Sequence, residues 1–439
     1  DGREWNVRLS RRENPDLLDK LAAAFEAMWQ DDAFEPFESE RFEYARARAA
    51  GHAGVSLAPF VLDLRPHDFQ DEVLDKLAAA RALHERRRNL IVAATGTGKT
   101  MIAAFDYRRL RAAGPRLLFV AHRKEILEQA RASFAAVLRE PEFGELLVDG
   151  QRPRAAEHLF ASIQSLKSRL PELGPRDYDY VVIDEFHHAE AKTYRDLLEH
   201  LQPRELLGLT ATPERADGRD VTHWFDGHVT AELRLWDALA RGWLCPFHYY
   251  GVADDVDLSQ LAWSQGGYVQ AELDRVLTGN HARVRRVLAA IQQYVSAPAS
   301  MRALGFCVSV AHARFMAAQF EAQGIAAAVV VGDTPATERT QALSRLRSGS
   351  LRVIFCVDVF NEGVDLPEVD TLLFLRPTES ATVFLQQLGR GLRKYGEDKI
   401  TTVLDFIGNA HRRFRFDLRL RALLDVRQRG LVDQEIGRA

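Results

Sequence analysis

Residues 94–100 have the composition of a phosphate-binding loop, and they directly follow the apolar run 89–93. Glycines in such a turn let backbone N–H groups approach a phosphate. The lysine reaches the outer phosphate oxygens, and the hydroxyl after it can bind Mg²⁺. A helix that begins here also directs its N-terminus at the anion. The general pattern has glycine at position 93, where this chain has Ala93. We predict a nucleoside-triphosphate site formed by Ala94, Thr95, Gly96, Thr97, Gly98, Lys99 and Thr100.

A second set of suitable residues follows the apolar run 180–183. Asp184, at the end of the expected strand, can hold Mg²⁺, and Glu185 can polarise an attacking water. An acidic turn without a catalytic role is the alternative, and the phosphate loop earlier in the chain disfavours it. His187 and His188 suggest zinc, but no further ligand cluster accompanies them in the sequence.

Arg390 and Arg393 lie three positions apart, about one helical turn, so that both face the same way. Arginines supplied by a second domain can neutralise charge that develops on a transferred phosphate. A solvated basic helix end is the alternative, and it poorly explains the two glycines that flank Arg390, because glycine weakens a helix. We therefore expect both arginines to face the Lys99 loop across a cleft.

Apolar runs separated by helical stretches occur in two series, which is typical of parallel sheets covered on both faces. The chain is therefore predicted to be an α/β protein with two tandem RecA-like domains of mostly parallel sheets, plus a short N-terminal helical segment at 16–29. The expected strands are 89–94, 116–122, 158–164, 180–185 and 205–212 in the first series, and 303–309, 326–332, 351–357, 371–376 and 400–406 in the second.

The same pattern divides the chain into five segments. We predict an N-terminal segment at 1–59, an ATP-binding domain at 60–220, an irregular linker at 221–269, a second RecA-like domain at 270–410 and a basic helical tail at 411–439. The tryptophans of the linker can stack on bases, but packing against the domains is the favoured interpretation. In the tail, contact with nucleic-acid phosphates is the alternative to a solvated amphipathic helix.

Eight short stretches resemble motifs of the DEAH-like branch of superfamily 2 helicases and translocases, and they occur in the order of the family. They are 69–70, 94–100, 121–123, 162–166, 184–187, 210–212, 358–365 and 386–393. The resemblance implies that Gln70 reads adenine, that Gly363 and Asp365 of the 358–365 motif contact the nucleotide, and that Gln386 belongs to the catalytic set. It also implies that His187, Thr210 and Thr212 couple the nucleotide state to movement. The implied nucleic-acid contacts are His122, Arg123 and Gln164.

Within that superfamily, the first domain resembles the helicase subunit of type III restriction enzymes. The stretches 186–188, 207–215, 245–249 and 360–365 are closer to bacterial helicases that carry a phospholipase-D-like nuclease domain in front. The opening residues 4–8 resemble the tail of that nuclease domain. We therefore expect a fused nuclease-like domain before residue 1 and a further domain after residue 439.

Composition adds weaker constraints. The 439 residues have a formal net charge of −4, so a nucleic-acid partner requires a local basic path rather than an overall positive charge. No apolar run approaches the length of a membrane span. The three separated cysteines form no disulfide or zinc pattern, which favours a reducing cytoplasm.

The function implied is an ATP-driven helicase or translocase that uses ATP and Mg²⁺ and moves along nucleic acid, with DNA favoured over RNA. The alternative is the motor of a restriction or defence nuclease that remodels or translocates without separating strands. Cleavage by this chain itself is not expected. Residues 15–20 lie in a predicted helix without strand pairing, and the His122-Arg123-Lys124 stretch lacks the aspartate of a phospholipase-D motif, because position 129 is Gln129.

Overall fold

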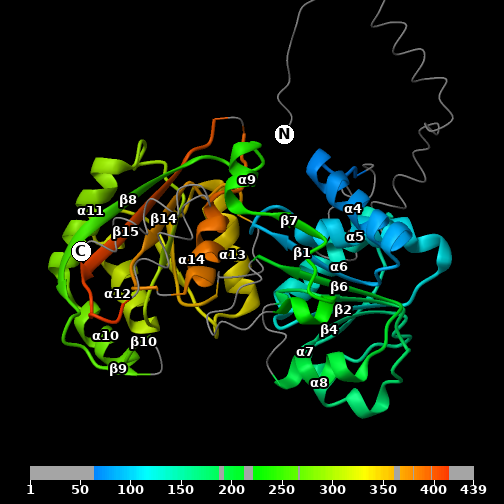
Figure 1. Ribbon diagram of the computed structural model, residues 1–439. Helices are drawn as coiled ribbons and strands as arrows, with labels where there is room; N and C mark the ends of the chain where they lie inside the picture. Colours follow the sequence, from blue (N-terminus) through cyan, green and yellow to red (C-terminus); the bar gives the residue numbers. More distant parts are fainter. Residues whose placement is uncertain are drawn as a thin grey trace, which may run out of the picture. The chain divides into compact units, whose positions relative to one another are not determined.

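The computed structural model describes residues 64–186, 192–211, 221–264, 267–359, 366–378, 380–396 and 398–414. Element labels follow Figure 1, where the first described helix is α4. Several predictions lie outside the described residues, namely those for the segments 4–8, 15–20 and 16–29, for the tail beyond residue 414, and for His187, His188, Thr212, Gly363 and Asp365.

The first lobe is a seven-stranded sheet with strand order β3-β4-β2-β5-β6-β1-β7, and every neighbouring pair is parallel. Its strands are β1 (Arg88–Ala93), β2 (Leu117–Ala121), β3 (Glu145–Leu147), β4 (His158–Ser162), β5 (Tyr180–Ile183), β6 (Glu205–Thr210) and β7 (Ala231–Leu233). Its helices are α4 (Asp68–His84), α5 (Lys99–Leu110), α6 (Lys124–Leu138), α7 (Ile163–Lys167) and α8 (Lys192–His200), with short 3-10 turns at Arg111–Ala113, Leu170–Glu172 and Val221–Phe225.

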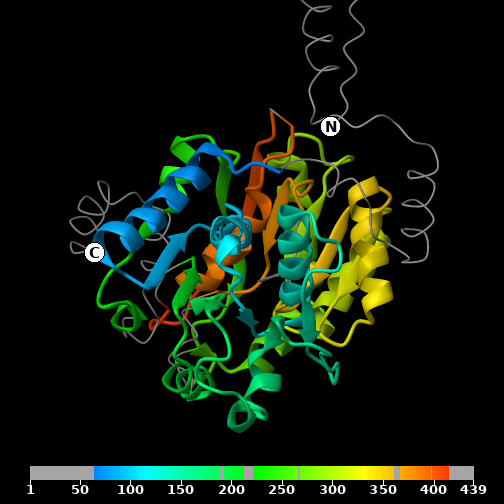
Figure 2. The same cartoon turned by 90° about the vertical axis from the view of Figure 1, so that its right-hand side faces the viewer.

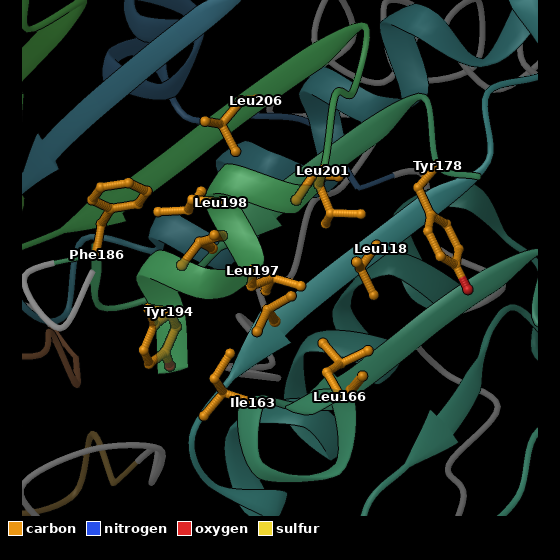
Figure 3. Packing of buried hydrophobic residues seen from close by; sticks show 14 of the residues in the cluster. Leu118, Ile163, Leu166, Tyr178, Phe186, Tyr194, Leu197, Leu198, Leu201 and Leu206 are labelled. Atoms are coloured by element: carbon orange, nitrogen blue, oxygen red, sulfur yellow. The ribbon is translucent and has the colours of Figure 1, made fainter. Parts of the chain in front are cut away.

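Alternating side chains of each central strand fill two cores on opposite faces of this sheet. On one face, Leu118 packs with the apolar residues of α7 and α8, as Figure 3 shows. On the other face, the ring of Phe119 contacts that of Phe134 in α6, with 6.0 Å between centroids. Because both faces are covered, the strands read as continuous apolar runs in the sequence.

The second lobe is a six-stranded parallel sheet with order β12-β13-β11-β14-β15-β8 (Figure 1, and turned by 90° in Figure 2). Its strands are β8 (Phe247–Asp257), β11 (Ala303–Phe306), β12 (Ala327–Val330), β13 (Val353–Cys356), β14 (Thr371–Phe374) and β15 (Thr401–Asn409). The remaining elements are α9 (Leu235–Ala240), α10 (Gln270–Leu277), α11 (His281–Tyr294), α12 (Val310–Glu321), α13 (Ala336–Ser348), α14 (Ala381–Gly391) and the hairpin of β9 (Trp263–Ser264) and β10 (Gly267–Tyr268).

The two parallel sheets confirm the predicted α/β class, with tandem RecA-like folds. The expectation of an irregular segment at 221–269 is wrong, because β7 joins the edge of the first sheet and β8 joins the edge of the second. The long edge strand β8 alternates buried and exposed positions and contains several aspartates, so it lacks the apolar run that marks central strands. None of the described helices combines the length and apolar character that a membrane crossing requires.

A buried ionic network fixes α4 against the first sheet. Arg81 of α4 donates two hydrogen bonds to the carboxylate of Asp106 in α5, at 2.7 and 2.6 Å, and one to Glu205 in β6, at 3.0 Å. Tyr180 donates to the same aspartate at 2.6 Å. The Asp106 side chain is fully buried, so it depends on these donors for its charge.

Replacing Arg81 by leucine is therefore expected to lower the free energy of unfolding by about 3–5 kcal/mol, because it leaves the buried Asp106 carboxylate without its cation. Glu205 keeps its ion pair with Arg87, at 2.7 Å. The matched control is Arg109→Leu, since Arg109 pairs with Asp71 and Asp75 at the surface and such pairs contribute about 1 kcal/mol or less. Urea titration followed by circular dichroism compares the two. Equal small losses would show that the network does not stabilise the lobe.

Candidate functional site

The carboxyl edge of the first sheet gathers the predicted motif loops. The four strands β2, β5, β6 and β1 are adjacent, and in parallel sheets ligands bind beyond the carboxyl ends of the strands. The phosphate loop follows β1, the Asp184 loop follows β5, and Thr210 ends β6. Thr210 is fully buried and pairs in register with Val92 of β1.

The phosphate loop has the backbone geometry that its glycines predict. Gly96 and Gly98 have φ angles of 92° and 79°, in the left-handed region that side chains disfavour. Gly98 caps α5, which begins at Lys99, so the N-terminus of the helix points into the loop. The Lys99 ammonium donates to the carbonyl of Ala93 at 3.1 Å. Alanine replaces the usual glycine without strain, because position 93 is the last residue of the extended strand β1.

Asp184 and Glu185 are both 7% exposed. The Asp184 amide donates to Val120 in β2, and its carboxylate accepts from the Glu185 amide, both at 3.0 Å. Glu185 has a φ of 51°, an unfavourable conformation for a residue with a Cβ, and such conformations cluster at functional sites. The next residue, Phe186, labelled in Figure 3, is fully buried against the ring of Phe225 and fixes the loop to the core.

Gln70 lies beside the phosphate loop at the first turn of α4. Its amide nitrogen donates to the Thr97 carbonyl at 3.5 Å, and its oxygen accepts from the His67 amide at 3.0 Å. The ring of the preceding Phe69 packs against that of Trp243, with ring centroids 4.3 Å apart and the planes tilted by 32°. This ring contact confirms the packing interpretation for Trp243.

Helix α14 supplies Arg390 and packs directly on the phosphate loop. The helix ends at Gly391, so Arg393 follows it and the two arginines do not share one helical turn as predicted. A Cβ added at Gly389 would meet the Thr95 Cβ at 2.6 Å, so glycine is required here by close approach. A Cβ added at Gly96 would meet the Arg393 Cγ at 3.3 Å. Arg390 is 5% exposed, which excludes the interpretation of a solvated helix end.

These elements enclose a cavity of about 860 Å³. Its lining includes the phosphate loop, Gln70 and both acidic residues of the first lobe, together with both arginines from the second. The predicted residues on its wall are Gln70, Thr95, Gly96, Thr97, Gly98, Lys99, Thr100, Asp184, Glu185, Arg390 and Arg393. Among the described residues, the cavity thus brings together the predicted phosphate, magnesium and arginine groups.

The electrostatics of the cavity favour an anion. Burial lowers the pKa of Arg393 to about 10, because a guanidinium removed from water loses hydration. A triphosphate placed beside it would restore favourable interactions for the charged form. Thr100 and Asp184 provide a hydroxyl and one carboxylate on the same wall. That donor set fits Mg²⁺, which binds through few protein oxygens and completes its shell with phosphate and water.

Other predicted residues lie elsewhere or contribute indirectly. Gln386, on α14, is 2% exposed and is not part of the cavity wall. Sequence reasoning missed Trp243, Pro367 and Lys394, which do line it. Trp243 carried a signal, as one of several tryptophans between the two series of strands. The other two lie near motifs in sequence but match no motif themselves.

The predicted nucleic-acid contacts occupy the same carboxyl edge. In β2 and β4, Ala121 and Ser162 are paired in register, so the His122-Arg123 pair and Gln164 follow neighbouring strand ends. Arg123 donates to the Val359 carbonyl of the second lobe at 3.2 Å.

A charged contact joins two helices close to this edge. Arg339 of α13 forms an ion pair with Glu125 of α6. The Arg123 and Arg339 contacts therefore link the lobes where a strand is expected to lie.

Lys99→Ala is expected to raise the dissociation constant for ATP at least about tenfold, or about 1.4 kcal/mol, because the main cation of the phosphate loop is lost. The fold should survive, since the Lys99 ammonium is only partly buried and its hydrogen bond goes to a single backbone carbonyl, that of Ala93. Isothermal titration calorimetry measures the affinity, with exposed Lys76→Ala as control. Unchanged affinity in Lys99→Ala would remove this loop from the nucleotide site.

Two family models match the chain. The model described as type III restriction enzyme, res subunit, matches residues 63–215, and the helicase conserved C-terminal domain matches residues 286–395. With the two RecA-like sheets, these matches identify the chain as a superfamily 2 helicase core that resembles type III restriction enzyme subunits. The predicted resemblance to superfamily 2 helicases and to the type III restriction enzyme subunit is thereby confirmed.

Several curated relatives are named as helicases or translocases. "Putative ATP-dependent helicase IRC3" of Saccharomyces cerevisiae is 27% identical over 78% of this chain and 51% of its own length. Its Schizosaccharomyces pombe counterpart, "Putative mitochondrial ATP-dependent helicase irc3", is 30% identical over 80% and 59%. "DNA 3'-5' translocase XPB2" of Sulfurisphaera tokodaii is 23% identical over 83% and 86%. The chain thus spans little more than half the length of the two IRC3 relatives.

Solved structures support the fold. "The fragment structure of a putative HsdR subunit of a type I restriction enzyme from Vibrio vulnificus YJ016" has a TM-score of 0.60 at 22% identity, covering 82% of this chain and 68% of that one. A Saccharomyces cerevisiae Dbp5 structure has a TM-score of 0.57 at 15% identity over 85% of this chain and 93% of that one. At these low sequence identities, the similarity shows only that the fold, with its two tandem sheets, is shared.

Proposed function

We propose that this helicase core couples ATP hydrolysis to movement along a nucleic-acid strand, and that the strand is DNA. The observation that carries the proposal is the shared cavity, in which the phosphate loop and Glu185 of one lobe face Arg390 and Arg393 of the other. A site built from two lobes responds to its nucleotide by changing their relative position. A nucleotide site contained in one lobe would not change the relative position of the two lobes.

In the proposed reaction, Lys99 and the loop amides bind the β- and γ-phosphates, while Thr100 and Asp184 hold Mg²⁺. Glu185 accepts a proton from the water that attacks the γ-phosphorus. The bond from that phosphorus to the bridging oxygen breaks, and ADP and phosphate leave. Arg390 and Arg393 stabilise the charge on the transferred group.

The coupling and strand contacts remain predictions from the family resemblance. Thr210, with Thr212 and His187 outside the described residues, would relay the state of the γ-phosphate. Gln386, one turn before Arg390 on α14, would belong to the same catalytic set. His122, Arg123 and Gln164 would contact the strand at the carboxyl edge of the first sheet. Gly363 and Asp365, also outside the described residues, would complete the nucleotide contacts of the second lobe.

DNA is favoured because the names of several relatives refer to it, among them "DNA 3'-5' translocase XPB2". A second match is the type I restriction enzyme EcoAI endonuclease subunit of Escherichia coli, which is 25% identical over 78% of this chain. The second match favours the other candidate function, a restriction-type motor that moves on duplex without separating strands.

Two assays run in parallel distinguish these candidates. Displacement of a labelled strand from a partial duplex reports unwinding, and displacement of a third strand from a triplex reports movement along intact duplex. Activity in the first assay would establish a helicase, and activity in the second alone would establish a translocating motor. If ATP supports neither, the core only clamps or remodels its partner.

Affinity for single-stranded nucleic acid should fall steeply with salt, because each phosphate contact releases counterions. The slope of log K against log salt is expected to be about −0.7 per contact. Affinity should also vary little with sequence, since backbone-tracking proteins read phosphates. Fluorescence anisotropy with oligonucleotides of equal length measures both. A strong preference for one sequence would argue against a translocating motor.

The domain limits 1–59, 60–220, 221–269, 270–410 and 411–439 are retained as a proposal, with the reservation that strands of the third segment join both sheets. We also retain the proposal of a nuclease-like domain in front, which rests on the resemblance of residues 4–8. The proposal of a further domain behind rests on the resemblance to the bacterial helicase family. A cytoplasmic setting is proposed from cysteine usage, and all three thiols are free and buried.

A further inference from the structure

Lys399 lies outside every motif, yet it is tightly bound to two functional segments. Its ammonium donates to the carbonyl oxygens of Gly391 at 2.6 Å, Arg393 at 2.7 Å and Pro367 at 2.8 Å. An ammonium group has three donors, and all three are used here. Gly391 and Arg393 belong to the segment 390–393, which carries both arginines of the cavity. Pro367 lines the same cavity.

The carbonyls that Lys399 binds need a donor. Helix α14 ends at Gly391, and the last carbonyls of a helix have no partners within it. Thr401 also donates to Gly391, at 2.6 Å, and the Cys245 amide donates to Leu392, at 2.8 Å. A positive charge at this end of the helix is favourable as well. The chain from Gly391 to Arg393 is therefore held by its carbonyls, with Lys399 supplying the charged contacts.

The held segment carries Arg393, whose side chain passes within van der Waals reach of Gly96 in the phosphate loop. The direction of a guanidinium depends on its backbone, and catalytic groups lose effectiveness when displaced by about 1 Å. We propose that Lys399 is a positioning residue for the arginine pair, holding the end of α14 so that Arg393 remains directed at the phosphates. This inference rests on the proposed ATP hydrolysis at the cavity.

The proposal predicts a pH dependence, because neutral lysine has two N–H donors for three carbonyls. Burial lowers the pKa of Lys399 to about 8; the neighbouring Cys245, Asp370 and Glu368 act to raise it, and Arg393 to lower it. Raising the pH through this value removes the third donor and the charge. Turnover should therefore fall on the alkaline side, while an arginine at position 399 would stay charged.

The experiment compares Lys399→Met, Lys399→Arg and the exposed control Lys76→Met in steady-state ATP hydrolysis with single-stranded DNA. Lys399→Met is expected to lower kcat at least about fivefold with KM for ATP nearly unchanged, since the loss concerns the transition state. From about pH 7 to 9, wild-type kcat should fall toward the level of Lys399→Met. Lys399→Arg should keep most of the activity and show a flat profile over that range.

Normal kcat in a folded Lys399→Met variant would overturn the proposal. If that variant does not fold, the arginine variant decides: a flat profile supports the positioning role, and an alkaline fall equal to that of wild type overturns it. Arg393→Ala, assayed alongside, separates the two levels of inference. If Arg393→Ala is inactive and Lys399→Met is normal, this inference alone fails. Normal turnover in Arg393→Ala would overturn the proposed role of the arginine pair and, with it, this inference.

Discussion

Replacing Glu185 by glutamine should reduce ATP turnover by about 100-fold or more while leaving ATP affinity close to that of wild type. A general base contributes about 10²–10⁴-fold to a rate, and glutamine cannot accept the proton. The substitution keeps the size of the side chain at a position whose backbone φ is 51°, so the loop conformation should persist.

The measurement pairs calorimetric ATP binding with phosphate release at saturating ATP and nucleic acid. Glu232→Gln is a matched control, because Glu232 pairs with Arg234 at the surface. A collapse of ATP affinity in Glu185→Gln, with unchanged turnover per bound ATP, would show that Glu185 binds the nucleotide instead of activating water.

Arg393→Ala and Arg390→Ala should each lower nucleic-acid-stimulated hydrolysis at least tenfold, about 1.4 kcal/mol, and the loss can approach about 10³-fold for an arginine that contacts the transferred phosphate. ATP binding should change less, because the charge that these groups stabilise develops in the transition state. Both arginines already line the cavity that contains Lys99.

Lysine replacements should rescue poorly, since lysine lacks the planar fork that spans two phosphate oxygens. The assay is steady-state phosphate release, with circular dichroism to verify folding. Turnover within twofold of wild type in both folded alanine variants would mean that the cavity works without the second lobe, contrary to the proposed two-lobe mechanism.

The central strands could be predicted from the sequence because both faces of each sheet are covered. All ten expected strands are present, with ends shifted by a few residues. The missed sheet strands β3, β7 and β8 all lie at sheet edges. In β8, Asp254 and Asp255 fall at a break in the register with β15, between the pairs Ala253–Ile407 and Asp257–Asn409. An edge strand of this kind forms because its backbone pairs with a strand that is distant in the sequence. The residues of the edge strand itself therefore show no apolar pattern that would predict it.

The nucleotide site was predictable for a different reason. A phosphate loop or an Asp-Glu pair after a strand requires its residues within a few positions, so the chemistry is visible locally. A surface helix does not explain the glycines beside Arg390, and the structure gives the cause for one of them: Gly389 lies against Thr95. Lys399 could not be found this way, because its role depends on hydrogen bonds to the carbonyls of Pro367, Gly391 and Arg393, which no local sequence pattern reveals.

The most direct test of the account is the rate of ATP hydrolysis by this core with and without single-stranded DNA, measured for wild type and Glu185→Gln in the same preparation. We expect DNA to raise the wild-type rate several-fold and Glu185→Gln to remain inactive under both conditions. A wild-type rate that ignores nucleic acid, or a rate that persists in Glu185→Gln, would contradict the claim that this cavity drives a nucleic-acid motor.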